Sequence, residues 1–308
     1  MYNKKLNLVL LGLALVAPFV FYPVFLMKVL CFALFACAFN LLLGFAGLLS
    51  FGHAVFLGTG AYVTGYVMTT YGLTPELGIL AGVVVSALVG FVYGKLAVRR
   101  EGIYFAMVTL ALAQLAFFFY LQTPFTGGED GLQGIPRGNL FGLIDLTDNM
   151  TMYYFVLAVF IIGFLTIYRI IHSPFGQVMK AIRENEPRAI SLGYKVNQYK
   201  LMTFVISATL AGLAGSTKAL VFQLASLTDV HWFMSGEVVL MTLLGGMGTI
   251  WGPVVGAASI VSMQNVLASG PLANYIHVVM GVVFVICVLA FRKGLVGELQ
   301  KLLRKNVS

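Results

Sequence analysis

Most side chains that could do chemistry in this chain interrupt long apolar stretches. A charge at the centre of a membrane helix costs about 2.5–3.5 kcal/mol, so such groups usually face protein or water. The polar residues in these stretches are Asn40, His53, Gln114, Lys218, Glu237, Gln264 and Asn265. Lys218 and Glu237 fall near the outer ends of their stretches, where they either pair or extend to the membrane surface. His53 stands at the start of a stretch, where we expect an interfacial histidine rather than a ligand.

The sequence contains no recognisable catalytic set. No chain of acidic residues crosses the apolar stretches, which argues against an ion-driven carrier. The phosphate-binding pattern GxxxxGK[ST] is missing, because "GFVYGKL" is too short and has Leu96 in place of the hydroxyl. We find no Ser/His/Asp set, paired carboxylates or HExxH. The sequence therefore predicts no catalytic residue, no metal and no cofactor, and any ATP would be hydrolysed by another chain.

The composition indicates an integral membrane protein. Of the 308 residues, 60% are hydrophobic and only 10% are charged, against about 25% charged in soluble domains. The mean hydropathy is +0.95. The three cysteines, Cys31, Cys37 and Cys287, lie inside apolar runs and are expected to be small buried hydrophobes. The basic balance does not predict nucleic-acid binding, since the positive residues stand between apolar spans.

A bilayer core takes about 20 helical residues, and on that scale the chain is an all-α protein of about ten transmembrane helices. We expect one transmembrane domain over 1–308, starting with a retained span rather than a signal peptide. The predicted spans are 6–24, 26–43, 54–70, 77–98, 102–122, 152–171, 201–222, 233–250, 252–269 and 275–291.

The distribution of positive charge predicts the orientation of these spans. With the N-terminus in the cytoplasm, all of the 19 Lys and Arg residues except Lys28, Arg137 and Lys218 lie on the cytoplasmic side. Cytoplasmic loops carry such an excess, so both termini are expected in the cytoplasm. The loop 123–151 then lies outside, where its Gly-rich turns form either a docking surface or a solvated connector.

Two glycine-rich stretches lie at membrane depth. The first is "NLLLGFAGLLSFGHAVFLGTGAY" at 40–62, and the second is "LLGGMGTIWGPVVGAAS" at 243–259. Their small residues either pack helices closely or mark broken helices that line a polar path. The two interpretations are compatible, and a shared L-G-x-x-G core suggests internal repetition. The candidate path residues are Asn40, Gly44, Gly47, Ser50, Gly52, His53, Gly245, Gly246 and Gly248.

The longest charged interval, "SPFGQVMKAIRENEPRAISLGYKVNQYK" at 173–200, predicts two short helices under the membrane. Ser173 is expected to cap the first helix, and Asn185 or Glu186 the second. Gly193 is expected to end the second helix in a left-handed conformation, and Asn197 to cap the seventh span. Phe175, Val178, Met179 and Ile182 recur on one apolar face. That face suits a partner groove, although a lipid surface or packing within the chain remains open.

These motifs resemble the permeases of branched-chain amino-acid ABC importers, the M-type subunit. The resemblance rests on 173–216, on both glycine-rich stretches and on "GGEDGLQGIP", which occur in the family's order and cover most of 37–290. The family's cytoplasmic motif usually reads E-A-A followed by a glycine. Glu186, Ala189 and Gly193 remain here, whereas Pro187 and Arg188 replace small residues.

The resemblance implies a translocation subunit in the bacterial inner membrane. Its expected partners are a second homologous permease, two ATP-binding cassette subunits, an extracytoplasmic solute-binding protein and membrane lipid. The residues implied in coupling to the ATPase are Phe175, Met179, Ile182, Arg183, Glu184, Asn185, Glu186, Ala189 and Gly193. The substrate stays open between branched-chain or related amino acids and urea or short amides. A stand-alone secondary carrier and a channel or scaffold remain rival classes.

Overall fold

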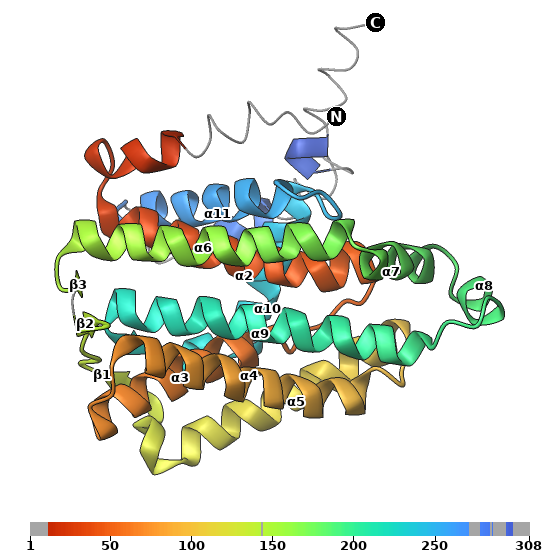
Figure 1. Ribbon diagram of the computed structural model, residues 1–308, viewed down its shortest axis with the longest axis horizontal. Helices are drawn as coiled ribbons and strands as arrows, with labels where there is room; N and C mark the ends of the chain where they lie inside the picture. Colours follow the sequence, from red (N-terminus) through yellow and green to blue (C-terminus); the bar gives the residue numbers. More distant parts are fainter. Residues whose placement is uncertain (1–11, 143, 271–277, 284, 286–293, 298–308) are drawn as a thin grey trace, which may run out of the picture.

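The computed structural model describes residues 12–142, 144–270, 278–283, 285 and 294–297. Its long helices run side by side, with the short strands at one end and α7 and α8 at the other (Figure 1). The α-helices are α2 (Pro23–Asn40), α3 (His53–Tyr71), α4 (Pro75–Ala97), α5 (Gly102–Gln122), α6 (Asn149–His172), α7 (Pro174–Glu184), α8 (Glu186–Ser191), α9 (Val196–Phe222), α10 (Trp232–Gly245) and α11 (Gly252–Ala268).

Shorter elements complete the described chain. The π-helix η2 (Leu41–Phe45) continues α2. The 3-10 helices are η1 (Ala17–Phe19), η3 (Pro124–Thr126), η4 (Gly128–Asp130) and η5 (Leu227–Asp229). The strands β1 (Leu132–Gln133) and β4 (Leu224–Ala225) pair antiparallel, as do β2 (Asn139–Leu140) and β3 (Ile144–Asp145).

The helices α2 and α9 form the centre of the molecule. In each, 72% of the most apolar segment is buried, against 22–33% in α4, α5 and α6. The outer helices expose large apolar side chains such as Leu88, Phe118 and Ile162. An apolar surface of this extent requires lipid rather than water around it.

Glycines set how closely the central helices approach. A Cβ built on Gly215 of α9 would lie 1.8 Å from the carbonyl oxygen of Leu57 in α3, and one on Gly60 would lie 2.2 Å from the oxygen of Gly212. Only a residue without a side chain permits such backbone contact.

The predicted spans are confirmed as helices from α2 to α11 within the described residues, with one change. Five helices there are long and apolar enough to cross a membrane, and α10 and α11 are shorter. The eighth predicted span, 233–250, is too long, because α10 ends at Gly245 where the backbone adopts positive φ at Gly246. The first predicted span, 6–24, is wrong as one continuous helix, because in its described part a helix over 12–16 is followed by η1 and a turn before α2 begins at Pro23. The last predicted span, 275–291, and Cys287 lie largely outside the described residues.

The two predicted loop regions lie at opposite ends of the bundle, separated by the length of α6 (Figure 1). We call the end that carries 123–151 the outer end and the end that carries 173–200 the inner end, following the orientation that the charges predict. The absolute orientation stays a prediction.

Candidate functional site: a junction of two broken helices

Both glycine-rich stretches are broken helices. After α2, the chain forms one turn of π-helix and then irregular backbone, with φ +73° at Gly47, before α3 begins at His53. After α10, Gly246 and Gly248 have φ +116° and +76°, and α11 begins at Gly252. The packing interpretation also holds, since a Cβ on Gly256 would lie 1.8 Å from the Met241 carbonyl oxygen.

The two breaks bind one another through Asn40. The amide nitrogen of its side chain donates to the Thr249 carbonyl oxygen at 2.9 Å, and its oxygen accepts from the Gly248 backbone nitrogen at 2.9 Å. Gly44 completes the contact, because a Cβ there would lie 2.6 Å from the same Gly248 nitrogen. The side chain therefore satisfies two backbone groups that the broken helices leave open.

The helix α7 reaches the same place. Its Arg183 donates from Nη1 to the Gly44 carbonyl oxygen, and the Arg183 side chain lies 3.0 Å from a Cβ built on Gly47. One turn earlier, the Lys180 ammonium lies 5.7 Å from the centre of the Phe45 ring. We call Asn40, Gly44, Gly47, Arg183 and Gly248 the junction.

The remaining candidate path residues are Ser50, Gly52, His53, Gly245 and Gly246. Ser50 is buried and its Oγ accepts from the Gly52 nitrogen at 3.2 Å. A Cβ on Gly52 would lie 3.0 Å from the Thr109 oxygen of α5, and one on Gly245 would lie 1.8 Å from the Gly252 oxygen. Their role in a translocation path stays a prediction, since all of them are engaged in packing in this structure.

His53 is buried, so the expectation of an interfacial histidine is wrong. Its ring meets Phe39, Phe56 and Phe204 edge to face, with centroids 5.1, 5.4 and 5.8 Å away. Its Nε2 lies 2.8 Å from the Ser207 Oγ, and that hydroxyl donates to the Ala38 carbonyl oxygen. A hydroxyl has one proton to give, so His53 must donate from Nε2.

The two short helices at the inner end are confirmed. Ser173 Oγ caps α7 by accepting from the Gly176 nitrogen at 3.3 Å, and Asn185 caps α8 by accepting from the Arg188 nitrogen at 3.0 Å. Gly193 has φ +85°. The predicted cap at Asn197 is wrong, because α9 begins at Val196 without a side-chain cap.

The apolar face of these helices packs against the chain itself. Met179, Ile182 and Ala189 are buried, and Phe175 is half-buried against Tyr199. The Glu186 carboxylate binds the Lys200 ammonium at 2.6 and 2.7 Å. Sequence reasoning did not identify Lys200, because the bend that brings it to Glu186 is tertiary.

The surface left open at the inner end is the tip around α8. Glu184 and Asn185 are exposed there, as are Ile190, Leu192 and Tyr194, which are 58%, 69% and 40% exposed. These three apolar residues are not among those assigned to coupling from the sequence, although exposed leucine and isoleucine beside a charged helix are a sign of a contact surface.

At the outer end, the ion pair differs from the one considered from sequence. Lys218 binds Asp229 rather than Glu237, whose carboxylate accepts from the Gln264 amide at 3.1 Å.

In the outer loop, hydrogen bonds from the Thr147 hydroxyl and backbone nitrogen hold the pKa of the exposed Asp145 below its ordinary value.

These features define a multi-pass membrane protein with two broken helices tied to a helix at its inner end. The family model described as "Branched-chain amino acid transport system / permease component" matches residues 24–288. The chain belongs to this family.

Several curated proteins are similar to the chain. The high-affinity branched-chain amino acid transport system permease protein LivM of Salmonella typhimurium is 30% identical over 251 residues, covering 74% of this chain and 59% of its own length. The LivM protein of Escherichia coli is 30% identical over 256 residues with the same coverage. The ribose import permease protein RbsC of Bacillus subtilis is 26% identical, covering 80% of this chain and 81% of its own length. No solved structure matches the chain.

Proposed function

We propose that this chain is a membrane-spanning subunit of an ATP-driven importer for branched-chain or related amino acids. It would receive solute from an extracytoplasmic binding protein and move it by alternating access across the bacterial cytoplasmic membrane. The proposed complex contains a second homologous permease and two ATP-binding cassette subunits, with both termini of this chain in the cytoplasm. Membership of the permease family and the names of its LivM relatives support this proposal.

The observation that carries the proposal is the contact of Arg183 with the junction. One helix, α7, binds the break after α2 and lies beside the break before α11. Beyond the C-terminal end of α7, the tip around α8 exposes Ile190, Leu192 and Tyr194, which a partner could contact. A displacement at the tip can therefore reach both broken helices without passing through a flexible linker.

The expected mechanism is a two-state switch. ATP-driven closure of the partner subunits moves the tip, and the half-buried Lys200–Glu186 pair keeps α8 fixed to the start of α9. The helix α7 then moves as a rigid body and shifts Gly44 against Gly248. Among the residues that the resemblance implies in coupling, Met179, Ile182 and Ala189 would hold α7 and α8 against the start of α9. Glu184 and Asn185 would face the partner.

A neutral solute, urea or a short amide, is the alternative substrate within the same mechanism. The junction itself does not discriminate between the two, because its polar atoms bind backbone groups of this chain. A substrate assay must therefore include both classes of solute.

The test is transport by the complex assembled with its ATP-binding subunits in liposomes. We expect uptake of radiolabelled L-leucine to require both ATP and the binding protein. Uptake without ATP would indicate a secondary carrier, and flux without the binding protein would indicate a channel. Either result would contradict the proposal, as would an intact complex that transports acetamide but no amino acid.

The partner surface is tested separately with Leu192→Lys. This substitution places a charge on the exposed tip and should abolish co-purification of the ATP-binding subunits. The matched control is Ile144→Lys at the outer end, where the side chain is 48% exposed, and it should leave co-purification unchanged. Equal effects of the two substitutions would argue against the tip as the docking surface.

A further inference from the structure

The outer end contains a buried ion pair that the junction does not use. Lys218 of α9 binds Asp229 at the end of η5, and the two side chains are 14% and 2% exposed. The Lys218 ammonium also lies 5.7 Å from the centre of the Phe32 ring and 5.9 Å from that of Phe222. Removing two charges from water costs several kcal/mol per ion, and charges within a membrane protein usually serve substrates or ions.

The hydrogen-bond network around this pair is incomplete. The second carboxylate oxygen of Asp229, Oδ2, and the hydroxyl of Tyr62 are both buried, and neither has a hydrogen-bond partner among the described residues. The Tyr62 ring stacks on Tyr120 at 4.9 Å, and the Tyr120 hydroxyl is satisfied by Thr59 at 2.9 Å. Buried polar groups without a partner are rare and costly. These two therefore point to a group that the chain itself does not supply.

The two open groups belong to the same small region. A Cβ on Gly58, one turn before Tyr62, would lie 2.3 Å from the side chain of Val230, the residue after Asp229. Helix α3 thus presents Tyr62 on the side where η5 presents Asp229.

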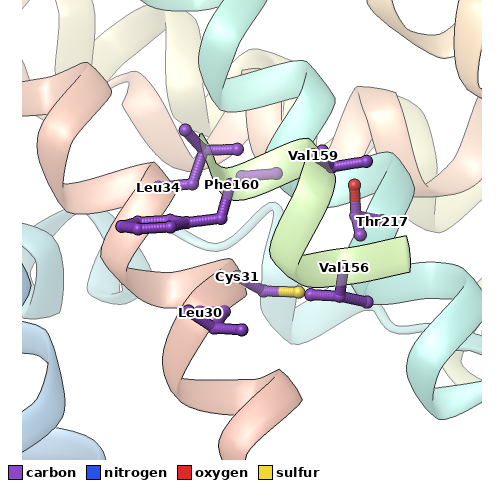
Figure 2. Close-up of a pocket in the computed structure, with 8 residues that line it drawn as sticks. Leu30, Cys31, Leu34, Val156, Val159, Phe160 and Thr217 are labelled. Carbon is purple, nitrogen blue, oxygen red and sulfur yellow. The ribbon is translucent and has the colours of Figure 1, made fainter. Parts of the chain in front are cut away.

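An apolar gap begins next to the ion pair. It lies between α2, α6 and α9, and its lining includes Thr217, the neighbour of Lys218, and Cys31, the neighbour of Phe32 (Figure 2). Leu34, Val156 and Phe160 are among its other apolar lining residues. The spaces between these side chains are too narrow for a water molecule. An aliphatic side chain would fit only after α2 and α6 move apart.

The chain that carries Asp229 is held from the outer side. Strand β1 of the outer loop pairs with β4, the Ile135 nitrogen donates to the Gln223 oxygen at 3.1 Å, and Arg137 donates to the Val221 oxygen at 2.9 Å. The outer loop therefore covers the segment between α9 and η5. This segment lies at the outer end, where the proposed binding protein would deliver solute.

We propose that Lys218, Asp229 and Tyr62 form a binding site for the charged α-amino and α-carboxylate groups of an amino acid. The ligand carboxylate would replace Asp229 at the Lys218 ammonium, and the ligand ammonium would bind Asp229 and the Tyr62 hydroxyl. The exchange conserves net charge, because the ligand brings one positive and one negative group. One ion pair within the chain is replaced by two ion pairs between the chain and the ligand. This inference rests on the proposed function and names the residues that would recognise its substrate class.

The test is equilibrium binding of radiolabelled L-leucine to the full chain in lipid nanodiscs. Leucine methyl ester lacks the carboxylate, 4-methylpentanoate lacks the ammonium, and acetamide lacks both. We expect unlabelled leucine to compete and the other three to compete weakly. Absence of saturable binding, or competition by acetamide equal to that by leucine, would overturn the site.

Tyr62→Phe is the sharpest variant, because the hydroxyl has no hydrogen-bond partner among the described residues and its removal should not harm folding. Loss of one hydrogen bond to a charged group predicts about tenfold weaker leucine binding. The control is Tyr104→Phe at an exposed position of α5, with leucine affinity and thermal stability expected to match the wild type. Wild-type affinity in Tyr62→Phe would contradict the inference.

Uptake by the assembled complex separates this site from the proposed function. ATP-dependent leucine uptake that is unchanged by Tyr62→Phe would refute the site and leave the importer intact. Leucine binding that is weakened by Tyr62→Phe, in a complex whose uptake ignores ATP, would support the site and refute the importer.

Discussion

The inner and outer ends of the bundle each bury a lysine against a carboxylate, yet the two pairs are built differently. At the inner end, Lys200 binds both oxygens of Glu186 and lies 3.8 Å from Glu101. At the outer end, Lys218 binds one oxygen of Asp229 and the other oxygen has no partner among the described residues.

This difference separates a structural pair from a candidate binding pair. A carboxylate whose oxygens are both occupied is best suited to hold two helices in a fixed relation. A carboxylate with one open oxygen beside an open hydroxyl retains the capacity to bind a ligand. We therefore expect substitutions at the inner pair to affect coupling and those at the outer pair to affect solute binding.

The largest effect is expected from Lys218→Met. It leaves Asp229 charged, buried and unpaired, which costs about 3–5 kcal/mol in comparable buried pairs. The double variant Lys218→Met/Asp229→Leu removes both charges and should recover most of the thermal stability measured in nanodiscs. Leucine binding should stay lost in both variants. Recovery of binding in the double variant would show that the pair is only structural.

A smaller loss of stability is expected from Gly44→Val. The new Cβ would lie 2.6 Å from the Gly248 nitrogen and 2.1 Å from the Asn40 side-chain oxygen, and overpacking of this kind costs about 1–3 kcal/mol. ATP-dependent uptake should fall to background, while leucine binding at the outer end persists. Gly236→Ala is the control, because nothing lies within 4 Å of a Cβ there.

Lys200→Met should cost less, about 1 kcal/mol, because the Glu186 side chain is 24% exposed and can turn to water. We expect ATP hydrolysis to continue in the assembled complex while leucine uptake per ATP decreases, since α8 is no longer fixed to α9. Unchanged coupling would contradict a mechanical role for the inner pair.

The smallest effect concerns the exposed outer loop. The Thr147 hydrogen bonds lower the pKa of Asp145 in the folded chain, so their stabilising contribution is present above the unfolded pKa and is lost as the pH falls through the lowered value. Thr147→Ala should reduce the difference in thermal midpoint between pH 7 and pH 3. A variant with the same pH dependence as the wild type would show that the hydroxyl bond contributes nothing measurable.

Local signals in the sequence were sufficient for the helices and their ends at the inner side. Ser173, Asn185 and Gly193 act within one turn of the backbone they cap or terminate, so their residue types predict their conformations. The cap predicted at Asn197 is wrong because a capping residue type in a polar run does not by itself fix where the next helix begins. The start of α9 at Val196 is instead fixed by packing of its first turn.

The partners of the charged residues could not be predicted from spacing. Lys218 and Glu237 are neighbours in successive spans, whereas Asp229 lies in a short polar connector that reads as a loop. The turn after α9, with Gln223 at φ +54°, returns the chain so that Asp229 meets Lys218. Equally, nothing in the order of residues indicates that Arg183 reaches Gly44, 139 positions earlier.

Composition and periodicity by themselves determined that this chain is a bundle of apolar helices with a charged segment at one end, because hydrophobicity and helix capping act over a few residues. Only the tertiary structure decided which polar groups meet. Contacts such as Asn40 with Gly248, or Lys218 with Asp229, depend on how closely helices approach, and that distance is fixed by glycines on different helices acting together.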